Sequence, residues 1–452
     1  MTTVLMTMSK RSLIAMPVPA EAAGLGIYLR PAENSSTRVG SLYRDPNGAV
    51  TFTVDQKYIA LGPRRPILSL AWQEPTEEGT KARLLNNGDK ITQGAILPPF
   101  FENLLPEGAL LELVRKEFGS GAFDNFDVLR RLGHDLPGAV VAVPETGEAP
   151  PAAAASTIHG RHDIGERIHF SLAGIQLKFS MKQNDKGSLT LPVSGSAGDM
   201  ILKTPSEKHF MVPEAEFAAL ALARAAGVKT VDARLVSARE IEGIDEKYLG
   251  KNVNSLVVTR FDRAAGGRRI HIEDFAQVIG AIHDQKYAMA NQSTLVKLVG
   301  LFSTDKRGEM LQAVRRLVVD IMVGNSDSHL KNWSFILPDG INPGLSPAYD
   351  ILPFFYYGDD RMALQFGKTN DPAVVNLRRF ERLAGLVGLD TDLVVREVRQ
   401  TMQQIFDTWP GLMAELPTPP NFARKLIERW DSLTLVKEVR PTVVQGHSDQ
   451  IS

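Results

Sequence analysis

The stretch that decides the fold is Gly324-Asn-Ser-Asp327-Ser-His329-Leu-Lys331-Asn332, followed by Tyr349-Asp350-Ile351. It combines two carboxylates with a side-chain amide, and only the apolar run Trp333–Leu337 and a loop separate its two parts. Phosphoryl transfer needs a carboxylate that accepts the proton of an attacking hydroxyl. It also needs hard oxygen ligands that hold Mg2+ on the nucleotide phosphates. The residue types of this stretch suit that chemistry.

The spacing of the stretch points the same way. Asp327 and Asn332 have four residues between them, as in the protein-kinase catalytic loop, and a later loop aspartate there binds metal. The alternative is that these residues are polar turn residues around a helix end. The flanking glycine, histidine and lysine, together with the later Tyr349-Asp350, favour the catalytic interpretation.

A lysine and a glutamate upstream fit the same scheme. Lys203 closes the apolar strand predicted at 199–203, where kinases place the lysine that pairs the nucleotide phosphates. Glu216 follows thirteen residues later, in an amphipathic helix predicted over Pro213–Ala226. It is placed to orient the lysine through an ion pair. The alternative is that both are ordinary surface charges.

A small-residue loop precedes the lysine. After the β-like run Arg167–Phe170 comes Ser171-Leu-Ala173-Gly174-Ile175-Gln176-Leu177-Lys178. Such a loop between strands lets backbone N–H groups approach phosphates, although no Walker motif is present. A plain hairpin turn is the alternative.

A strand predicted at Leu256–Arg260 leads into Phe261-Asp-Arg263. A kinase connects its lobes at this point, so we expect edge backbone that bonds adenine, with Phe261 packed on the ring. The alternative places Phe261 in the core. Loop, lysine, glutamate, hinge, catalytic loop and metal aspartate thus occur in one consistent order, and this agreement is the main argument.

Composition limits the class of protein. The chain has 452 residues, 51 Lys and Arg against 52 Asp and Glu, and no cysteine. Disulfides, thiolate metal sites and thiol nucleophiles are excluded, and DNA binding by bulk charge is not expected. Apolar runs are too short to cross a membrane, so we expect a cytoplasmic protein. The N-terminus has basic residues before an apolar run, as a signal peptide does, but the run is too short and is interrupted by prolines.

The pattern of strands and helices predicts an α+β, two-lobed kinase-like fold with an additional N-terminal β-rich subdomain and a helical C-terminal lobe. Expected strands include Gly26–Leu29, Arg38–Tyr43 and Ala49–Val54, and expected helices include Phe123–Leu132 and Ile272–His283. The expected divisions are an irregular extension 1–23, a subdomain 24–143, a linker 144–157, an N-lobe part 158–265, a helical C-lobe 266–440 and a mobile tail 441–452.

On these motifs the sequence resembles the HipA family of bacterial serine/threonine kinase toxins. The matching segments are Ser171–Lys178, Ile201–Lys203, Glu216, Thr259–Asp262, Gly324–Asn332 and Tyr349–Ile351, together with Phe101-Glu-Asn-Leu-Leu-Pro106 and Gly138-Ala-Val140 in the N-terminal part.

The resemblance implies a role for each matched residue. Asp327 would be the general base, Asn332 and Asp350 would hold Mg2+, and Lys203 would contact the ATP phosphates. Ser171 would be autophosphorylated. The remaining nucleotide contacts would come from Ala173, Gly174, Ile175, Gln176, Leu177 and Lys178 at the phosphates, Thr259, Arg260 and Phe261 at the hinge, and His329, Leu330, Lys331 and Tyr349 in and after the catalytic loop.

The resemblance also implies partners. Family members phosphorylate proteins, notably an aminoacyl-tRNA synthetase, and a helix-turn-helix antitoxin of the HipB type carries the kinase to operator DNA. Two other functions stay open. One is a small-molecule or lipid kinase on a related fold, whose phosphoryl chemistry would be the same. The other is a largely non-catalytic corepressor partner of a helix-turn-helix protein.

Overall fold

The computed structural model describes residues 23–145, 177–250 and 253–440, apart from positions 33, 46, 87, 93–95, 108–110, 112–114, 116–123, 185–187, 191–197, 207 and 245. Several expectations lie outside these residues. They are the extension before Ala23, nearly all of the linker 144–157, the segment with Ser171 and Ala173–Gln176, and the tail 441–452.

The N-terminal part, residues 23–145, is called here the N-terminal module. Its antiparallel sheet has the order β4-β3-β2-β1-β5 and packs over its own apolar core. Alternating side chains and the Asp45–Gly48 turn specify it; the Gly48 amide donates to the Asp45 carbonyl at 3.0 Å. Its elements are β1 (Ala23–Ala32), β2 (Ser35–Arg44), β3 (Val50–Val54), α1 (Gln56–Ile59), η1 (Gly62–Arg64), η2 (Leu70–Trp72), α2 (Glu77–Leu85), β4 (Ile91–Thr92), α3 (Pro99–Glu102), α5 (Asn125–Leu132) and β5 (Val140–Pro144).

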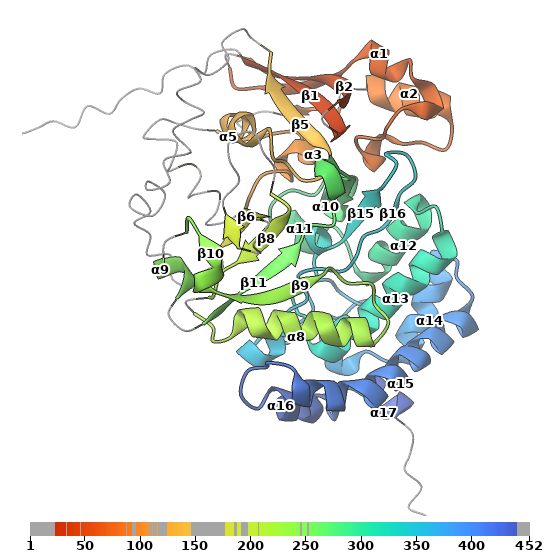
Figure 1. Cartoon of the computed structure of the whole chain (residues 1–452). Coiled ribbons are helices and arrows are strands. Elements are labelled where there is room, and N and C mark those ends of the chain that lie inside the picture. The colour runs from red at the N-terminus through yellow and green to blue at the C-terminus, as the bar shows by residue number, and fades with distance from the viewer. Residues whose placement is uncertain are drawn as a thin grey trace, which may run out of the picture.

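A second sheet, called here the central sheet, has the order β10-β7-β6-β8-β11-β9. Its elements are β6 (Lys178–Gln183), β7 (Leu189–Thr190), β8 (Met200–Lys203), β9 (Ala233–Ser237), η4 (Ala238–Glu240), β10 (Ile241–Glu242), α9 (Glu246–Leu249) and β11 (Asn254–Thr259). Helix α8 (Val212–Ala225) lies along β9 and β11 (Figure 1). Pro213 at its start and Gly227, with φ of 82°, just beyond its end match the predicted boundaries.

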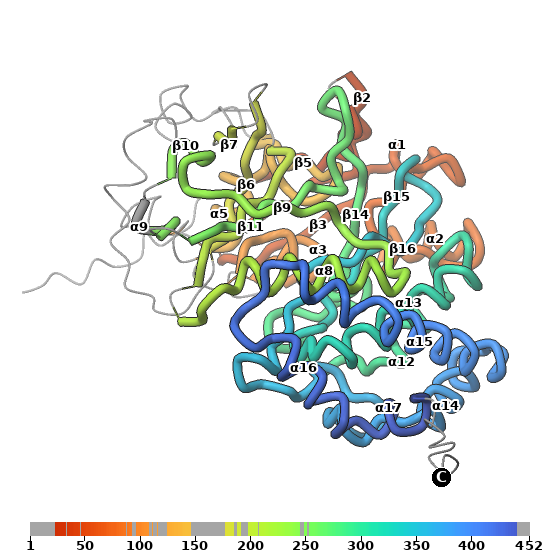
Figure 2. Tube along the Cα trace, turned by 60° about the horizontal axis from the view of Figure 1, so that its bottom comes forward, coloured from red at the N-terminus to blue at the C-terminus, as the bar shows by residue number. Residues whose placement is uncertain are grey.

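Helices dominate the rest of the chain, and α12, α13, α14 and α15 group away from the N-terminal module (Figure 2). A short hairpin, β12 (Arg263–Ala264) and β13 (Arg268–Arg269) with η5 (Ala265–Gly267) between, leads into this helical lobe. The lobe contains β14 (His271–Asp274), α10 (Phe275–Ile279), α11 (Gln285–Ala288), α12 (Gln292–Phe302), α13 (Lys306–Val323), η6 (Leu330–Asn332), β15 (Ser334–Leu337), β16 (Gly344–Leu345), η7 (Phe354–Tyr357), η8 (Pro372–Val374), α14 (Leu377–Val387), α15 (Thr391–Glu415), α16 (Phe422–Trp430) and α17 (Thr434–Val439).

The helix predicted over Ile272–His283 is wrong at both ends. Residues 271–274 form β14, which pairs with β15, and the helix α10 begins only at Phe275. Asp274 caps it, because its carboxylate accepts from the Gln277 amide while the Gln277 side chain returns to the Asp274 amide. Gly280, with φ of 74°, then ends the helix.

Charged residues join the N-terminal module to the central sheet. The guanidinium of Arg260 contacts Asp262 at 2.9 Å and Asp135 of the module at 3.2 Å. Arg263 contacts the same two carboxylates, and Arg269 donates to the carbonyls of Leu136, Gly138 and Val140. Because these arginines are buried with their partners, the module is held in one orientation.

A buried carboxyl group joins the module to the helical lobe. Glu273 in β14 accepts from the Ser69 hydroxyl at 2.5 Å and from the Leu70 amide at 2.7 Å. Its side chain is fully buried, and desolvation raises its pKa to about 8.

This carboxyl group should make stability depend on pH. Its pKa is higher in the folded than in the unfolded protein, so the stabilisation is complete below about 4.5 and is lost as the pH rises through about 8. The difference between these two pKa values corresponds to at most ~5 kcal/mol of folding stability. We expect the thermal midpoint to fall across this window in the native protein, and to fall less in Glu273→Gln. The exposed-site variant Glu381→Gln is the control. Equal slopes in all three proteins would contradict the assignment.

Candidate active site

A lysine between two carboxylates forms the centre of the site. Lys203, the last residue of β8, is buried, and its ammonium group contacts the carboxylates of Glu216 in α8 and of Asp350. The other oxygen of Asp350 accepts from Lys178 in β6 at 2.9 Å. The predicted ion pair between Lys203 and Glu216 is therefore present, and Lys203 and Lys178 together join Asp350 to the central sheet.

These contacts fix the charges of the group. Burial alone would lower the pKa of Lys203, but the carboxylates of Asp350 and Glu216 raise it above its usual value. Burial would raise the pKa of Asp350, but Lys178 and Lys203 hold it well below its usual range. Both groups are thus ionised at neutral pH, as phosphate contact and metal binding require.

Asp350 has a backbone conformation that is rare outside glycine. Its φ is 53°, in the left-handed region, which aspartate adopts more readily than most residues. The preceding Tyr349 is anchored, because its hydroxyl donates to the Lys331 carbonyl at 2.9 Å and lies 2.5 Å from the Ser334 hydroxyl. Strained residues of this kind cluster at functional sites, where the surroundings maintain them.

The loop predicted to be catalytic, residues 324–332, begins where α13 ends and is called here the catalytic loop. Gly324 caps the helix with φ of 73°, and a Cβ there would lie 2.6 Å from the Phe355 ring, so only glycine fits. Three residues later, the Asp327 carboxylate is about two-fifths exposed and accepts from the Tyr287 hydroxyl at 3.1 Å. Desolvation raises the pKa of Asp327, and the charge of nearby Asp350 adds to this effect.

The later residues of the loop surround Asp327. The side-chain amide of Asn332 donates to the Asp327 carbonyl at 2.8 Å, which leaves its oxygen as the atom for a cation. His329 Nε2 lies 4.0 Å from Asp327, and burial lowers the pKa of His329 to about 4, so the ring is neutral at pH 7. Leu330 is buried in the helical core. Asn332 and Asp350 together offer the oxygen donors that Mg2+ prefers.

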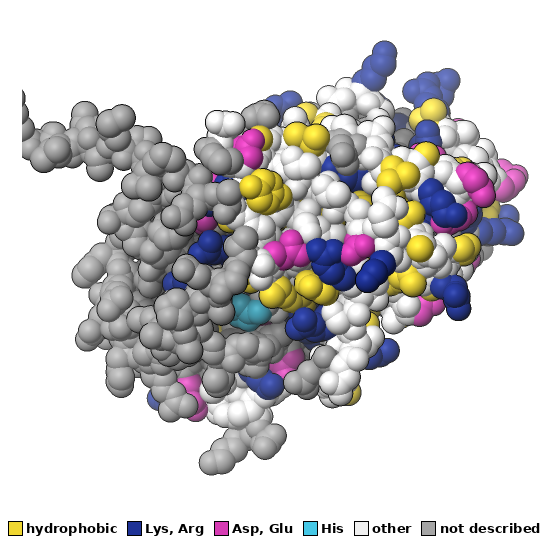
Figure 3. All heavy atoms as spheres, turned by 90° about the horizontal axis from the view of Figure 1, so that it is seen from above, with side chains coloured by type: hydrophobic (Ala, Val, Ile, Leu, Met, Phe, Trp, Pro, Cys, Tyr) yellow, Lys and Arg dark blue, Asp and Glu magenta, His cyan; other side chains and the backbone are white. Residues whose placement is uncertain are grey.

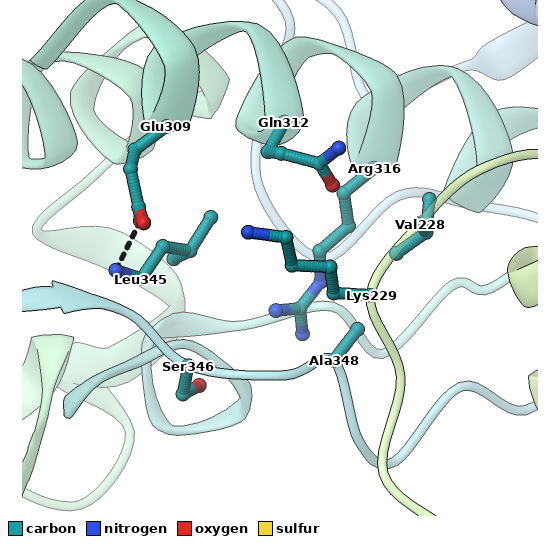
Figure 4. A pocket seen from close by; sticks show the side chains of 8 residues that line it. All are labelled: Val228, Lys229, Glu309, Gln312, Arg316, Leu345, Ser346 and Ala348. Atoms are coloured by element: carbon teal, nitrogen blue, oxygen red, sulfur yellow. Dashed lines mark hydrogen bonds between the residues drawn. The ribbon is translucent and has the colours of Figure 1, made fainter. Parts of the chain in front are cut away.

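Two buried charged residues of α13 form hydrogen bonds with residues of the loop. Arg316 in α13 donates to the Asn332 carbonyl at 2.5 Å and lies 4.0 Å above the Trp333 ring. Asp320 accepts from the side chains of Asn325 and Ser328 at 2.9 and 2.8 Å. Arg316 also lines a small cavity with Lys229, Gln312 and Ser346 (Figure 4), and its Nε and Nη1 atoms have no hydrogen-bond acceptor among the described residues.

The segment predicted as the hinge differs from expectation in one respect. We expected backbone groups at a strand edge that could bond adenine, but β11 lies inside the central sheet. Two backbone amides of the segment are already bonded, because Thr259 donates to the Asp232 carbonyl and Arg260 donates to the Asp199 carbonyl. The Arg260 guanidinium is occupied at the module interface. Phe261 packs against the helical core and stacks on Tyr349 with ring centroids 5.6 Å apart. Phe261, predicted to pack on adenine, and Tyr349, predicted to complete the nucleotide site, thus lie together.

Two contributors were not found from the sequence. Tyr287, which contacts Asp327, lies in α11, beyond the end of the predicted helix. Glu107 of the N-terminal module reaches Lys331 in the catalytic loop at 3.1 Å. Neither has a local signal, because each acts through contacts with distant parts of the chain.

The comparisons with known families cover most of the chain. The HipA-like C-terminal domain matches residues 170–409, which contain Lys203, Glu216, Asp327, Asn332 and Asp350. The HipA N-terminal domain matches residues 34–143, in the N-terminal module.

Individual relatives agree with these matches. The chain is 36% identical to a Sinorhizobium fredii protein named "Putative kinase Y4dM", over 88% of this chain and 96% of the relative. It is 24% identical to "Serine/threonine-protein kinase toxin HipA" of Shewanella oneidensis, over 71% and 78% of the two chains. A solved structure of Shewanella oneidensis HipA with HipB and operator DNA matches 93% of this chain and all of that chain, with a TM-score of 0.69 and 19% identity. The chain therefore belongs to the HipA family.

Proposed function

We propose that this protein is a cytoplasmic serine/threonine protein kinase that uses Mg-ATP. The main observation behind this proposal is that the buried Lys203 lies between Glu216 and Asp350, next to the loop with Asp327 and Asn332. Relatives named as kinases support the reaction class.

Each of these residues would have a separate role in phosphoryl transfer. Lys203, held by Glu216, would contact the ATP phosphates once the nucleotide replaces Asp350 as its partner. Mg2+, held by Asn332 and Asp350, would supply positive charge on the phosphates. Asp327 would accept the proton of the substrate hydroxyl, whose oxygen bonds to the γ-phosphorus while the bond to the ADP oxygen breaks. Its exposed carboxylate is accessible to a protein side chain.

We further propose that the kinase is the toxin of a toxin–antitoxin module. The toxin name of Shewanella oneidensis HipA and the solved complex of HipA from that organism with HipB and operator DNA support a helix-turn-helix partner. DNA contact through that partner fits the net charge of −1 and the mixed charges on the face in Figure 3. An aminoacyl-tRNA synthetase is the proposed substrate. Within the described residues, no helix has the length and apolar character to cross a membrane.

The function can be tested with γ-labelled ATP and a bacterial lysate. We expect Mg2+-dependent label on serine or threonine of one or a few proteins, which mass spectrometry would identify. EDTA should abolish it. Label only in small molecules or lipids would instead support the alternative kinase class.

Autophosphorylation at Ser171 is expected to inactivate the enzyme. A phosphate there adds about −1.5 to −2 charges next to the segment proposed to cover the ATP phosphates, so it should repel the nucleotide. We expect weaker ATP binding after incubation with Mg-ATP, and no change in Ser171→Ala. An unmodified Ser171, or a phosphorylated form that binds ATP normally, would contradict this switch.

A further inference from the structure

A carboxylate of the N-terminal module lies between two lysines of the helical lobe. Glu107 contacts Lys286 Nζ at 2.7 Å through one oxygen and Lys331 Nζ at 3.1 Å through the other. Lys331 also donates to the Asn103 carbonyl at 3.2 Å. Both lysine side chains are at most 15% exposed, so this cluster is only partly open to water.

Each lysine adjoins a residue that contacts Asp327. Lys286 precedes Tyr287, whose hydroxyl donates to the Asp327 carboxylate. Lys331 precedes Asn332, whose side-chain amide donates to the Asp327 carbonyl. Two separate segments, α11 and the catalytic loop, thus meet at Asp327 on one side and at Glu107 on the other.

The negative charge of Glu107 compensates the positive charges of Lys286 and Lys331. Desolvation opposes its charge, yet Lys331 and Lys286 lower the pKa of Glu107 to about 2, so it is ionised at any working pH. Without its charge, the two partly buried ammonium groups would lose the carboxylate that both of them contact and would repel each other. They would separate towards water, and α11 and the catalytic loop would move with them.

The module does not depend on this cluster for its attachment. Asn103 donates to the Ala281 carbonyl at 2.7 Å, and Gln277 donates to the Phe100 carbonyl at 3.0 Å. The arginine cluster around Asp135 and Asp262 and the buried Glu273 hold it elsewhere. Removal of the Glu107 charge should therefore leave the module docked and the chain folded.

We infer that Glu107 is a positioning residue for phosphoryl transfer, through which the N-terminal module holds Tyr287 and Asn332 in place around Asp327. This inference rests on the proposed function, and it assigns Lys331 to the module contact and not to the nucleotide.

The test compares Glu107→Gln, Glu107→Lys and the charge-exchanged pair Glu107→Lys with Lys331→Glu in the full chain. We expect Glu107→Gln to lower kcat by about 10- to 100-fold with less than about a twofold change in the KM for ATP. Glu107→Lys should be worse, and the exchanged pair should recover only the contact with position 331, because Lys286 would then face a lysine. The control Glu428→Gln removes an exposed ion pair with Arg424 and should match the native protein. A native kcat in Glu107→Gln, or a kcat in Glu107→Lys no lower than in Glu107→Gln, would overturn the inference.

A second readout does not require activity. Hydrogen exchange of amides 327–332 should be about tenfold faster in Glu107→Gln than in the native protein or Glu428→Gln, because the loop loses an anchor. Unchanged exchange would overturn the inference. Native protein without any phosphoryl transfer would reject the proposed kinase function, and the exchange rates would still decide the role of Glu107.

Discussion

Replacement of Asp327 by asparagine is expected to lower phosphoryl transfer by about 10²- to 10⁴-fold with little change in ATP affinity. Asparagine has nearly the shape of aspartate and can still accept from the Tyr287 hydroxyl. It cannot take the proton of the substrate hydroxyl, however, so the loss should fall on kcat. Transfer in the native protein should likewise fall in acid as Asp327, whose pKa burial raises, becomes protonated.

The matched control is Asp284→Asn. Asp284 is an exposed aspartate at the start of α11 and makes no side-chain capping bond, so its replacement should leave transfer unchanged. Measurement of kcat and of the ATP dissociation constant for the three proteins decides the matter. A folded Asp327→Asn protein with near-native kcat would refute the role as a base.

Asp350→Asn should have opposite effects on two forms of ATP. Mg-ATP binding should weaken by at least about 10-fold. Even mutation of a residue that only hydrogen-bonds to a metal ligand typically lowers metal affinity by about 10- to 100-fold. Metal-free ATP should bind no more weakly than before, or more tightly. The reason is that Asp350 is a negative charge that occupies Lys203 and Lys178, and asparagine releases both lysines for the phosphates.

Calorimetry with and without Mg2+ separates these effects. The control is Asp359→Asn, because the exposed Asp359 side chain accepts a hydrogen bond only from the nearby Arg361 amide within the described part of the chain. Equal weakening of both ATP forms by Asp350→Asn would mean that Asp350 does not act through a metal.

The central elements were predictable because their signals are local. Lys203 closes an apolar strand, and Glu216 lies on the helix that begins at a proline and ends before a glycine. A kinase-like chain brings these two elements together, so their order along the sequence was enough to pair them. The same holds for the first three strands, where alternation and an Asp-Pro-Asn-Gly turn set the register.

The start of α10 carries a local signal that the helix predicted over Ile272–His283 does not follow. Asp274-Phe-Ala-Gln277 is a capping-box pattern that marks the start of α10, whereas apolar periodicity alone extended the predicted helix across β14. The partner strand β15 comes some sixty residues later, and periodicity carries no information about it.

The contacts of Glu107 depend on how the module and the helical lobe meet, whereas Tyr287 reaches Asp327 from within that lobe. Tyr287 lies in a four-residue helix, and Glu107 follows a proline at the end of a short segment. Neither position differs locally from an ordinary surface residue. The packing of α3 against α10, with its hydrogen bonds from Asn103 and Gln277, brings Glu107 to the catalytic loop, and α11 with Tyr287 packs directly on η6.

A structure with Mg2+ and a non-hydrolysable ATP analogue tests the central claim most directly. We predict that Lys203 contacts the analogue's phosphates while it keeps Glu216, that Asn332 and Asp350 bind the metal, and that the γ-phosphate faces Asp327. A bound analogue whose phosphates lie elsewhere, with Lys203 still between Glu216 and Asp350, would contradict the account.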